Sequence, residues 1–77
     1  LLYAERARLL FRQQNFPAAV ADCDKALTLD PGLAPVFGLR ADCYAANGES
    51  GKAFADYERA IEADPEHAAD YRLSRAE

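Results

Sequence analysis

The sequence predicts an all-α fold of stacked antiparallel helix pairs, for two reasons. Residue types return at a spacing of 34 residues, and apolar residues recur at three- and four-residue steps without strand-length alternation. The clearest matches are Arg6-Ala7 with Arg40-Ala41, Ala21-Asp22 with Ala55-Asp56, and Asp30-Pro31 with Asp64-Pro65. Self-similarity of this period is typical of repeat proteins, in which each unit packs on its neighbours and function is usually binding along one face.

The first helix pair is expected within residues 1–33. An amphipathic pattern of apolar and charged residues predicts a helix over about 1–13. The second helix is predicted over about 17–29, because the missing N–H of Pro17 would be unpaired in a first turn anyway. Asn15 is a suitable residue to cap this second helix.

The second pair is expected within residues 34–66. Its helices are predicted over about 35–46 and 51–63, and Asn47-Gly48 between them is a strong turn signal. The remaining residues, 67–77, predict either a capping helix or the start of a third unit.

Small residues recur where the two helices of a pair should cross. Ala7 and Ala41 are expected to face Ala19 and Ala53, because helix axes approach closely only where side chains are small. The side chains expected to point inward are Leu2, Tyr3, Ala7, Leu9 and Leu10; Ala19, Val20, Cys23, Ala26 and Leu27; Val36, Phe37, Ala41, Cys43 and Tyr44; and Ala53, Phe54, Tyr57, Ala60 and Ile61.

Composition narrows the classes of partner. The chain has 77 residues and a net charge of -4, and an acidic chain repels nucleic acid and anionic membrane at long range. Neither is therefore an expected partner, and no apolar run approaches the length of a membrane span. Because Leu1-Leu2 begins a helical pattern directly, we expect a piece of a longer protein, and the compartment stays open.

The two cysteines, Cys23 and Cys43, fit no metal-binding spacing. They are far enough apart in sequence to close a disulfide loop, but their core-facing helical positions favour a role as small hydrophobic residues.

The recurring residues resemble the tetratricopeptide repeat (TPR) family. The residues that carry the resemblance are Phe37, Arg40-Ala41, Tyr44, Ala53, Tyr57, Ala60 and Pro65 in the second unit, and Tyr3, Arg6-Ala7, Leu10, Ala19, Cys23, Ala26 and Pro31 in the first. The resemblance implies a right-handed superhelical solenoid of two units plus a terminal helix. It weakens after residue 65, since Arg75 stands where a small residue is expected.

The resemblance also implies a concave groove lined by the first helix of each unit. The positions carried over are Ala4, Arg8, Phe11, Arg12, Gly38, Leu39, Asp42, Ala45, Ala46 and Arg72. One interpretation is a groove for an acidic peptide, in which the three arginines contact carboxylates and Phe11 is an apolar anchor. The alternative is that the arginines are solvated, with Arg8 neutralised by Asp42 or Glu5.

Some members of the family hold the C-terminal carboxylates of chaperone tails with a clamp of Lys, Asn and Arg side chains. The corresponding positions here are Ala4, Arg8, Leu39, Ala69 and Leu73. Four of these five side chains cannot donate a hydrogen bond. We therefore expect no binding of a chaperone tail by that mechanism.

Catalytic groups are not evident. His67 is interpreted as a surface residue, Ser50 and Ser74 have no evident base, and no Gly-rich phosphate loop is present, so we expect no enzyme, cofactor or metal site. Five carboxylates are expected on the solvated outer faces of the second helices: Asp22, Asp24, Asp56, Glu58 and Glu62.

The favoured function is a non-catalytic module that binds a peptide or protein segment. Two alternatives stay open. One is a structural role, with homo-oligomers formed through the end helix at Tyr71 and Leu73, and the other is a regulatory or substrate-recruiting segment of a larger enzyme.

Overall fold

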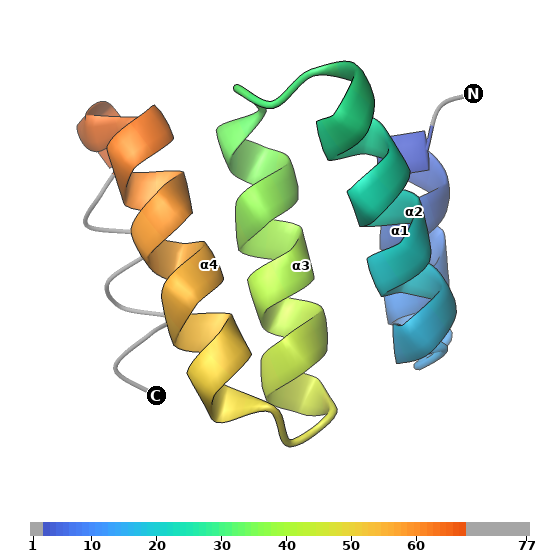
Figure 1. Cartoon of the computed structure of the whole chain (residues 1–77). Coiled ribbons are helices and arrows are strands. Elements are labelled where there is room, and N and C mark those ends of the chain that lie inside the picture. The colour runs from blue at the N-terminus through green and yellow to red at the C-terminus, as the bar shows by residue number, and fades with distance from the viewer. Residues whose placement is uncertain (1–2, 68–77) are drawn as a thin grey trace.

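The computed structural model describes residues 3–67, and four α-helices account for most of that range. They are α1 (Tyr3–Arg12), α2 (Phe16–Leu29), α3 (Ala34–Ala46) and α4 (Ser50–Ala63), followed by a short 3-10 helix, η1 (Pro65–His67). Consecutive helices run antiparallel and lie side by side in chain order (Figure 1). No strand occurs in residues 3–67, so the predicted all-α fold of helix pairs is confirmed. The terminal helix expected after His67 lies outside the described residues.

The turns within the two pairs follow from local backbone chemistry. α1 is followed by a turn at Gln14, whose φ of 64° is left-handed. α3 is followed by Gly48 with a φ of 83°, where the lack of a Cβ removes the steric penalty. Asn15 occupies the N-cap position of α2, but its side chain makes no capping hydrogen bond. Instead, the backbone carbonyl of Asn15 accepts the N–H of Ala19 at 3.0 Å, so the expected side-chain cap is wrong.

Alanines lie buried where the helices pack together most closely. Ala7, Ala19 and Ala41 are fully buried, and Ala53 is 3% exposed. Ala41 of α3 packs in one cluster with Ala53 and Tyr57 of α4, which confirms the predicted crossing of the second pair. Small side chains here let the two helices approach, and the larger Tyr57 fills the volume beside them.

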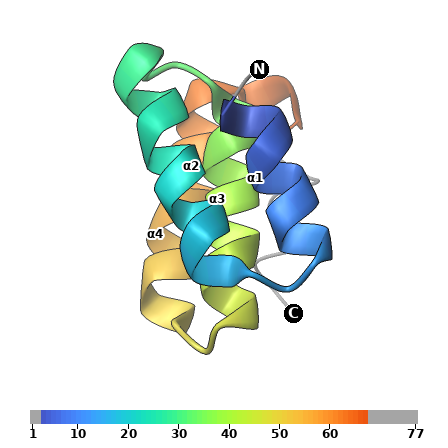
Figure 2. The ribbon, with the colours of Figure 1, turned by 90° about the vertical axis from the view of Figure 1, so that its right-hand side faces the viewer.

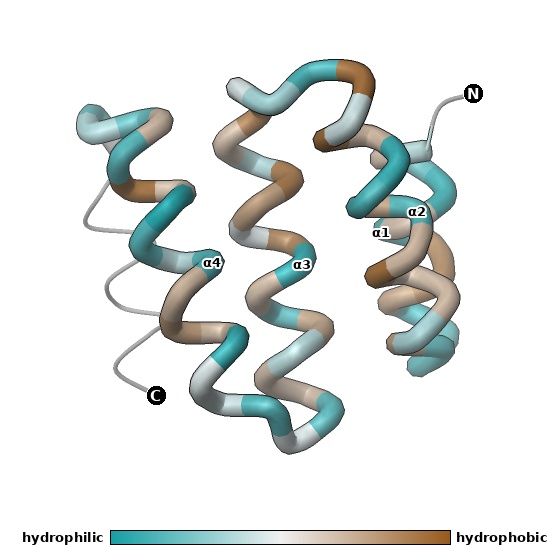
Figure 3. Tube along the Cα trace, viewed as in Figure 1, coloured by the Kyte–Doolittle hydropathy of each residue, from teal (hydrophilic) through white to brown (hydrophobic). Residues whose placement is uncertain are grey.

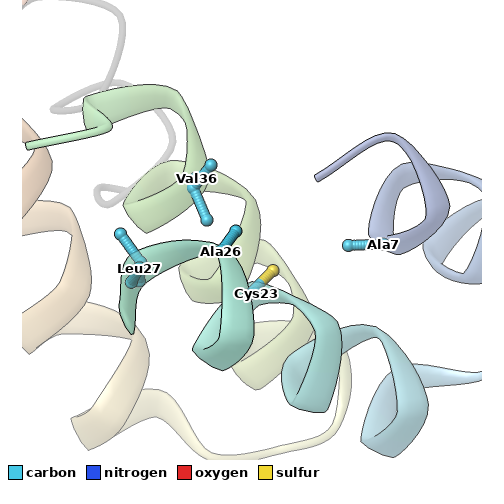
Figure 4. Packing of buried hydrophobic residues seen from close by; sticks show 5 residues of the cluster. All are labelled: Ala7, Cys23, Ala26, Leu27 and Val36. Atoms are coloured by element: carbon cyan, nitrogen blue, oxygen red, sulfur yellow. The ribbon is translucent and has the colours of Figure 1, made fainter. Parts of the chain in front are cut away.

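A second cluster joins the two helix pairs. It contains Ala7 of α1, Val36 of α3, and Cys23, Ala26 and Leu27 of α2, which lies between the other two helices (Figure 4). α2 is therefore buried on two faces, one against α1 of its own pair and one against α3 of the next pair.

Both cysteines are buried and free. Cys23 and Cys43 are each fully buried, and no disulfide joins them. The expectation that they act as small hydrophobic residues agrees with this burial. A hydrogen bond with Cys43, together with burial, raises the pKa of the Cys23 thiol.

Three residues expected in the core are exposed. Leu9 of α1 and Phe54 of α4 are each 52% exposed, and Tyr3 of α1 is 37% exposed, so their predicted inward orientation is wrong. The colouring in Figure 3 shows hydrophobic and hydrophilic residues interleaved along each helix. Periodicity alone could not separate the face that meets the partner helix from the face that points out of the pair.

Candidate functional site

Two buried carboxylates pair with arginines of the preceding helix. Arg6 donates two hydrogen bonds to Asp22, at 2.6 and 2.8 Å, and Arg40 donates two to Asp56, at 2.7 and 2.9 Å. Asp22 is 3% exposed and Asp56 is 1% exposed, so their expected solvated positions are wrong. A carboxylate is buried in this way when a planar guanidinium satisfies both of its oxygens.

Arg40 also joins the two helix pairs. Its Nη1 donates to Asp24 of α2 at 2.7 Å, while its Nε and Nη2 hold Asp56 of α4. Arg59 adds a further contact to Asp56 at 3.1 Å. The hydrogen bonds to Asp56 and Asp24 raise the pKa of Arg40 and keep it charged. One side chain thus connects three of the four described helices.

A third carboxylate, Asp42, lies in a different environment. It is half-buried on α3 and accepts a hydrogen bond from the Tyr57 hydroxyl of α4. Burial raises the pKa of Asp42, and the bond from Tyr57 opposes this shift in part. Neither Asp42 nor Glu5 forms an ion pair with Arg8, so the structure gives the predicted neutralisation of Arg8 no support.

The substitution of Asn for Asp should change stability in opposite directions at two of these sites. The Arg6 hydrogen bonds lower the pKa of Asp22, so its stabilising effect is present above the unfolded pKa of about 3.9 and is lost as pH falls through the lower folded value. At Asp42 the contribution to stability has the opposite sign. Burial raises the pKa of this carboxyl group, so folding disfavours its charged form and the carboxylate lowers stability once it is ionised.

Asp42→Asn should therefore raise the melting temperature at pH 7 by a few degrees, about the shift expected from 1 kcal/mol in a domain of this size. This gain should shrink as pH falls toward 4. Asp22→Asn should lower the melting temperature at pH 7, with a deficit that shrinks only below about pH 4. Thermal unfolding followed by circular dichroism from pH 3 to 7 measures both, and the same sign for both variants at pH 7 would contradict the assignment.

The groove positions carried over on α1 have mixed burial. Arg8 and Arg12 are exposed, whereas Ala4 and Phe11 are half-buried. The Phe11 ring packs against Phe16 of α2, with ring centroids 5.6 Å apart and planes tilted by 59°. Phe11 is thus held in place by an aromatic partner and keeps only part of its ring accessible.

The groove positions carried over on α3 include residues of the core. Gly38 is buried, Leu39 and Asp42 are half-buried, and Ala45 and Ala46 are exposed. Leu39, like Ala4, packs on the cluster between the two helix pairs. Arg72 lies outside the described residues, as do Ala69 and Leu73 of the clamp positions.

Two hollows occur at places that sequence reasoning missed. One, of about 240 Å³, is lined by Tyr3, Ala4, Ala26, Leu29, Asp30 and Leu33. The other, of about 290 Å³, is lined by Phe16, Pro17, Val20, Tyr44, Asn47, Glu49 and Lys52. The first shares Ala4 with the groove positions. The signal in the sequence was Leu29, an apolar residue directly before the helix-ending Asp30-Pro31 pair. In the structure its side chain is 74% exposed.

The described residues hold neither a metal-binding cluster nor a membrane-spanning helix. Residues 3–67 contain no group of three or more His, Cys, Asp or Glu side chains that could hold a metal ion. Within the same residues, each helix is too short or too polar to cross a bilayer.

The arrangement of the helix pairs matches a known repeat family. Two models described as tetratricopeptide repeat match the chain in tandem, one over residues 1–33 and the other over 34–67. The chain belongs to the tetratricopeptide repeat family. This membership confirms the resemblance in the sequence.

Curated relatives of this TPR chain are much longer proteins. It is 35% identical over 66 residues to a DnaJ homolog subfamily C member 7 homolog of Dictyostelium discoideum, covering 86% of the chain and 12% of the relative. It is 34% identical over 61 residues to an Hsp70-Hsp90 organizing protein of Triticum aestivum, covering 79% of the chain and 10% of the relative. The chain thus spans about a tenth of the length of these relatives.

A solved structure has the same TPR fold. The first TPR of Spaghetti (RPAP3), bound to the HSP90 peptide SRMEEVD, superposes with a TM-score of 0.80 at 25% identity, covering 97% of this chain and 64% of that one. Together with the family models, these relatives support the role of a protein-interaction module for this chain.

Proposed function

We propose that this TPR chain is a non-catalytic module that binds an acidic peptide segment along the groove lined by α1 and α3. Arg8 and Arg12 contact carboxylates of the peptide, and the accessible part of Phe11 packs on an apolar side chain. The domain organisation that goes with this proposal is a first unit over residues 1–33, a second over 34–66 and an end segment over 67–77.

The proposal rests on which arginines form ion pairs and which do not. Within residues 3–67, Arg6, Arg40 and Arg59 each pair with a carboxylate, whereas no ion pair involves Arg8 or Arg12. The two lie four residues apart on one helix, where like charges repel by about 0.2–0.5 kcal/mol. A carboxylate placed between them would relieve this repulsion, and planar guanidinium groups suit such recognition.

The peptide bound by the similar structure supports an acidic ligand for this chain. The residues of this chain, however, favour a different way of binding it. The peptide in the RPAP3 structure ends in two glutamates, a valine and an aspartate. In this chain, Ala4 and Leu39 stand at two of the clamp positions, and neither side chain can donate a hydrogen bond. Recognition therefore rests on Arg8, Arg12 and side-chain carboxylates of the peptide, rather than on a clamp for its C-terminus.

A charge-reversal experiment tests the groove. The probe is a fluorescein-labelled peptide of alternating Glu and Leu, blocked at both ends, with a Gln-for-Glu version as its neutral control. We expect the Glu peptide to bind and the Arg8→Glu, Arg12→Glu double variant to weaken it about tenfold or more, because two exposed ion pairs of up to about 1 kcal/mol each are reversed. Fluorescence polarisation at 50 and 300 mM salt measures the affinity, which should fall at the higher salt.

The matched control reverses two other cations. Lys25→Glu, Lys52→Glu changes the net charge by the same amount on α2 and α4 and should leave affinity within about twofold. Equal losses in both double variants would show an unspecific charge effect and reject the groove. Micromolar binding of a free SRMEEVD peptide, abolished by Arg8→Ala, would instead show that a C-terminal carboxylate is recognised.

A further inference from the structure

The hollow of about 290 Å³ lies between the two helix pairs. It is formed by the start of α2, the end of α3 and the start of α4, which lie at the same end of the molecule (Figures 1 and 2). Its lining residues are Phe16, Pro17, Val20, Tyr44, Asn47, Glu49 and Lys52. None of these is a groove position, so the hollow is separate from the groove that Arg8 and Arg12 line.

Two aromatic side chains in the wall of the hollow are held by contacts on their other sides. The Phe16 ring packs on Phe11, with ring centroids 5.6 Å apart. Tyr44 is half-buried and packs on the core cluster that α3 and α4 share. Because both rings are already ordered by these contacts, a ligand that enters the hollow does not have to order them, which favours binding.

The rim of the hollow carries one positive and one negative side chain. The Nζ of Lys52 lies 3.3 Å from Oε1 of Glu49 and 5.5 Å from the centroid of the Tyr44 ring. The Nδ2 of Asn47 donates to Oε2 of Glu49 at 3.4 Å, a long hydrogen bond. Glu49 stands at the N-cap of α4, but its side chain makes no capping bond. Since a carboxylate has about four lone-pair sites, Glu49 can accept a further hydrogen bond.

These side chains select the chemistry of a ligand. A cation that approached Glu49 would be repelled by Lys52, and an anion that approached Lys52 would be repelled by Glu49, because the two charges are only 3.3 Å apart. A purely aliphatic side chain would cover the Glu49 carboxylate without giving it a hydrogen bond, which is unfavourable. The hollow therefore suits a neutral aromatic side chain with a hydrogen-bond donor at its tip.

We propose that this hollow binds a tryptophan side chain of a partner protein. The indole ring packs on Phe16 and Tyr44, its N–H donates to the Glu49 carboxylate, and the Lys52 ammonium lies over its face. Tryptophan meets these contacts best, because its nitrogen is a donor only and its ring gives the strongest cation–π interaction. The volume lies at the lower end of the range of about 300–1,000 Å³ found for drug-sized ligands, so one large side chain fills the hollow.

Single amino-acid probes test this chemistry without altering the chain. N-acetyl-tryptophanamide is titrated into the ¹⁵N-labelled 77-residue chain and followed by NMR. We expect saturable shifts at the amides of Val20, Asn47 and Lys52 but not at Arg8 and Arg12. The Kd should be on the order of 1 mM, because one side chain makes few contacts. The 1-methylindole form of the probe, which lacks the N–H, should bind about fivefold more weakly.

Variants of the rim separate its two charges. Lys52→Ala removes the cation–π contact and should weaken the tryptophan probe about two- to fivefold. The same change removes the positive charge beside Glu49, so N-acetyl-argininamide should bind this variant about two- to fivefold more tightly than it binds the wild type. Glu49→Ala should weaken the tryptophan probe about fivefold. Glu62→Ala, which removes the same charge from an exposed position of α4, should leave its affinity unchanged.

Several results would overturn the proposal. Equal affinity for the two tryptophan probes would remove the role of Glu49. If N-acetyl-leucinamide bound the wild-type chain as tightly as the tryptophan probe, the hollow would be merely apolar, and if N-acetyl-argininamide bound more tightly, it would be a cation site. Shifts confined to Arg8 and Arg12 would place the probe in the groove, and a lack of saturable shifts would mean that the hollow does not bind tryptophan.

Discussion

Arg40→Ala should lower the free energy of unfolding by about 3–5 kcal/mol, the range found when one partner of a buried ion pair is removed. The Asp56 side chain is 2% exposed and would keep only the contact from Arg59, whose own side chain is 56% exposed. The same change breaks the bond to Asp24, which connects the second pair to the first. Urea unfolding at pH 7, followed by far-UV circular dichroism, measures the loss.

Two matched variants separate the causes of that loss. Arg6→Ala removes the same bidentate bond from the first pair but should cost clearly less, because the Arg6 side chain is 60% exposed and water reaches Asp22 once it is gone. Arg40→Lys keeps the charge but loses the planar fork, so its stability should lie between wild type and Arg40→Ala. Equal losses for Arg6→Ala and Arg40→Ala would show that the bridge to Asp24 contributes nothing.

The fold was predictable because its signal is repeated. Helix pairs, their turns and the buried alanines all followed from a spacing of 34 residues and from helical periodicity. The buried ion pairs were missed because an Asp is normally placed on the solvated face unless a partner is known. Yet Arg6 and Arg40 repeat, as do Asp22 and Asp56, each acid 16 residues after its arginine. A charge pair that repeats in register was the signal for a buried bond.

The faces of the helices were harder to assign. A helix in a stack has one apolar face toward its own partner and another toward the next unit, and periodicity adds the two together. Leu9 was placed in the core for this reason, although it lies on the face that points out of the first pair. The packing of Phe11 on Phe16 was also beyond the sequence, since it depends on how the turn at Gln14 brings α1 and α2 together.

Ala53→Leu should cost about 1–3 kcal/mol, because three extra heavy atoms enter a crossing that has no room for them. Ala53 is 3% exposed and packs with Ala41 and Tyr57, so α4 would have to move away from α3. That movement would also lengthen the bonds from Arg40 to Asp56 and from Tyr57 to Asp42, which cross the same interface. Urea unfolding at pH 7 measures the cost.

Ala55→Leu is the matched control, since Ala55 lies on the same helix but is exposed. It makes the same chemical change and should alter the free energy of unfolding by no more than about 0.5 kcal/mol. The two variants differ in whether the added side chain separates the helices. If Ala53→Leu unfolded at the same urea concentration as wild type, α3 and α4 would be held apart by other contacts, and small side chains would not set the spacing of this pair.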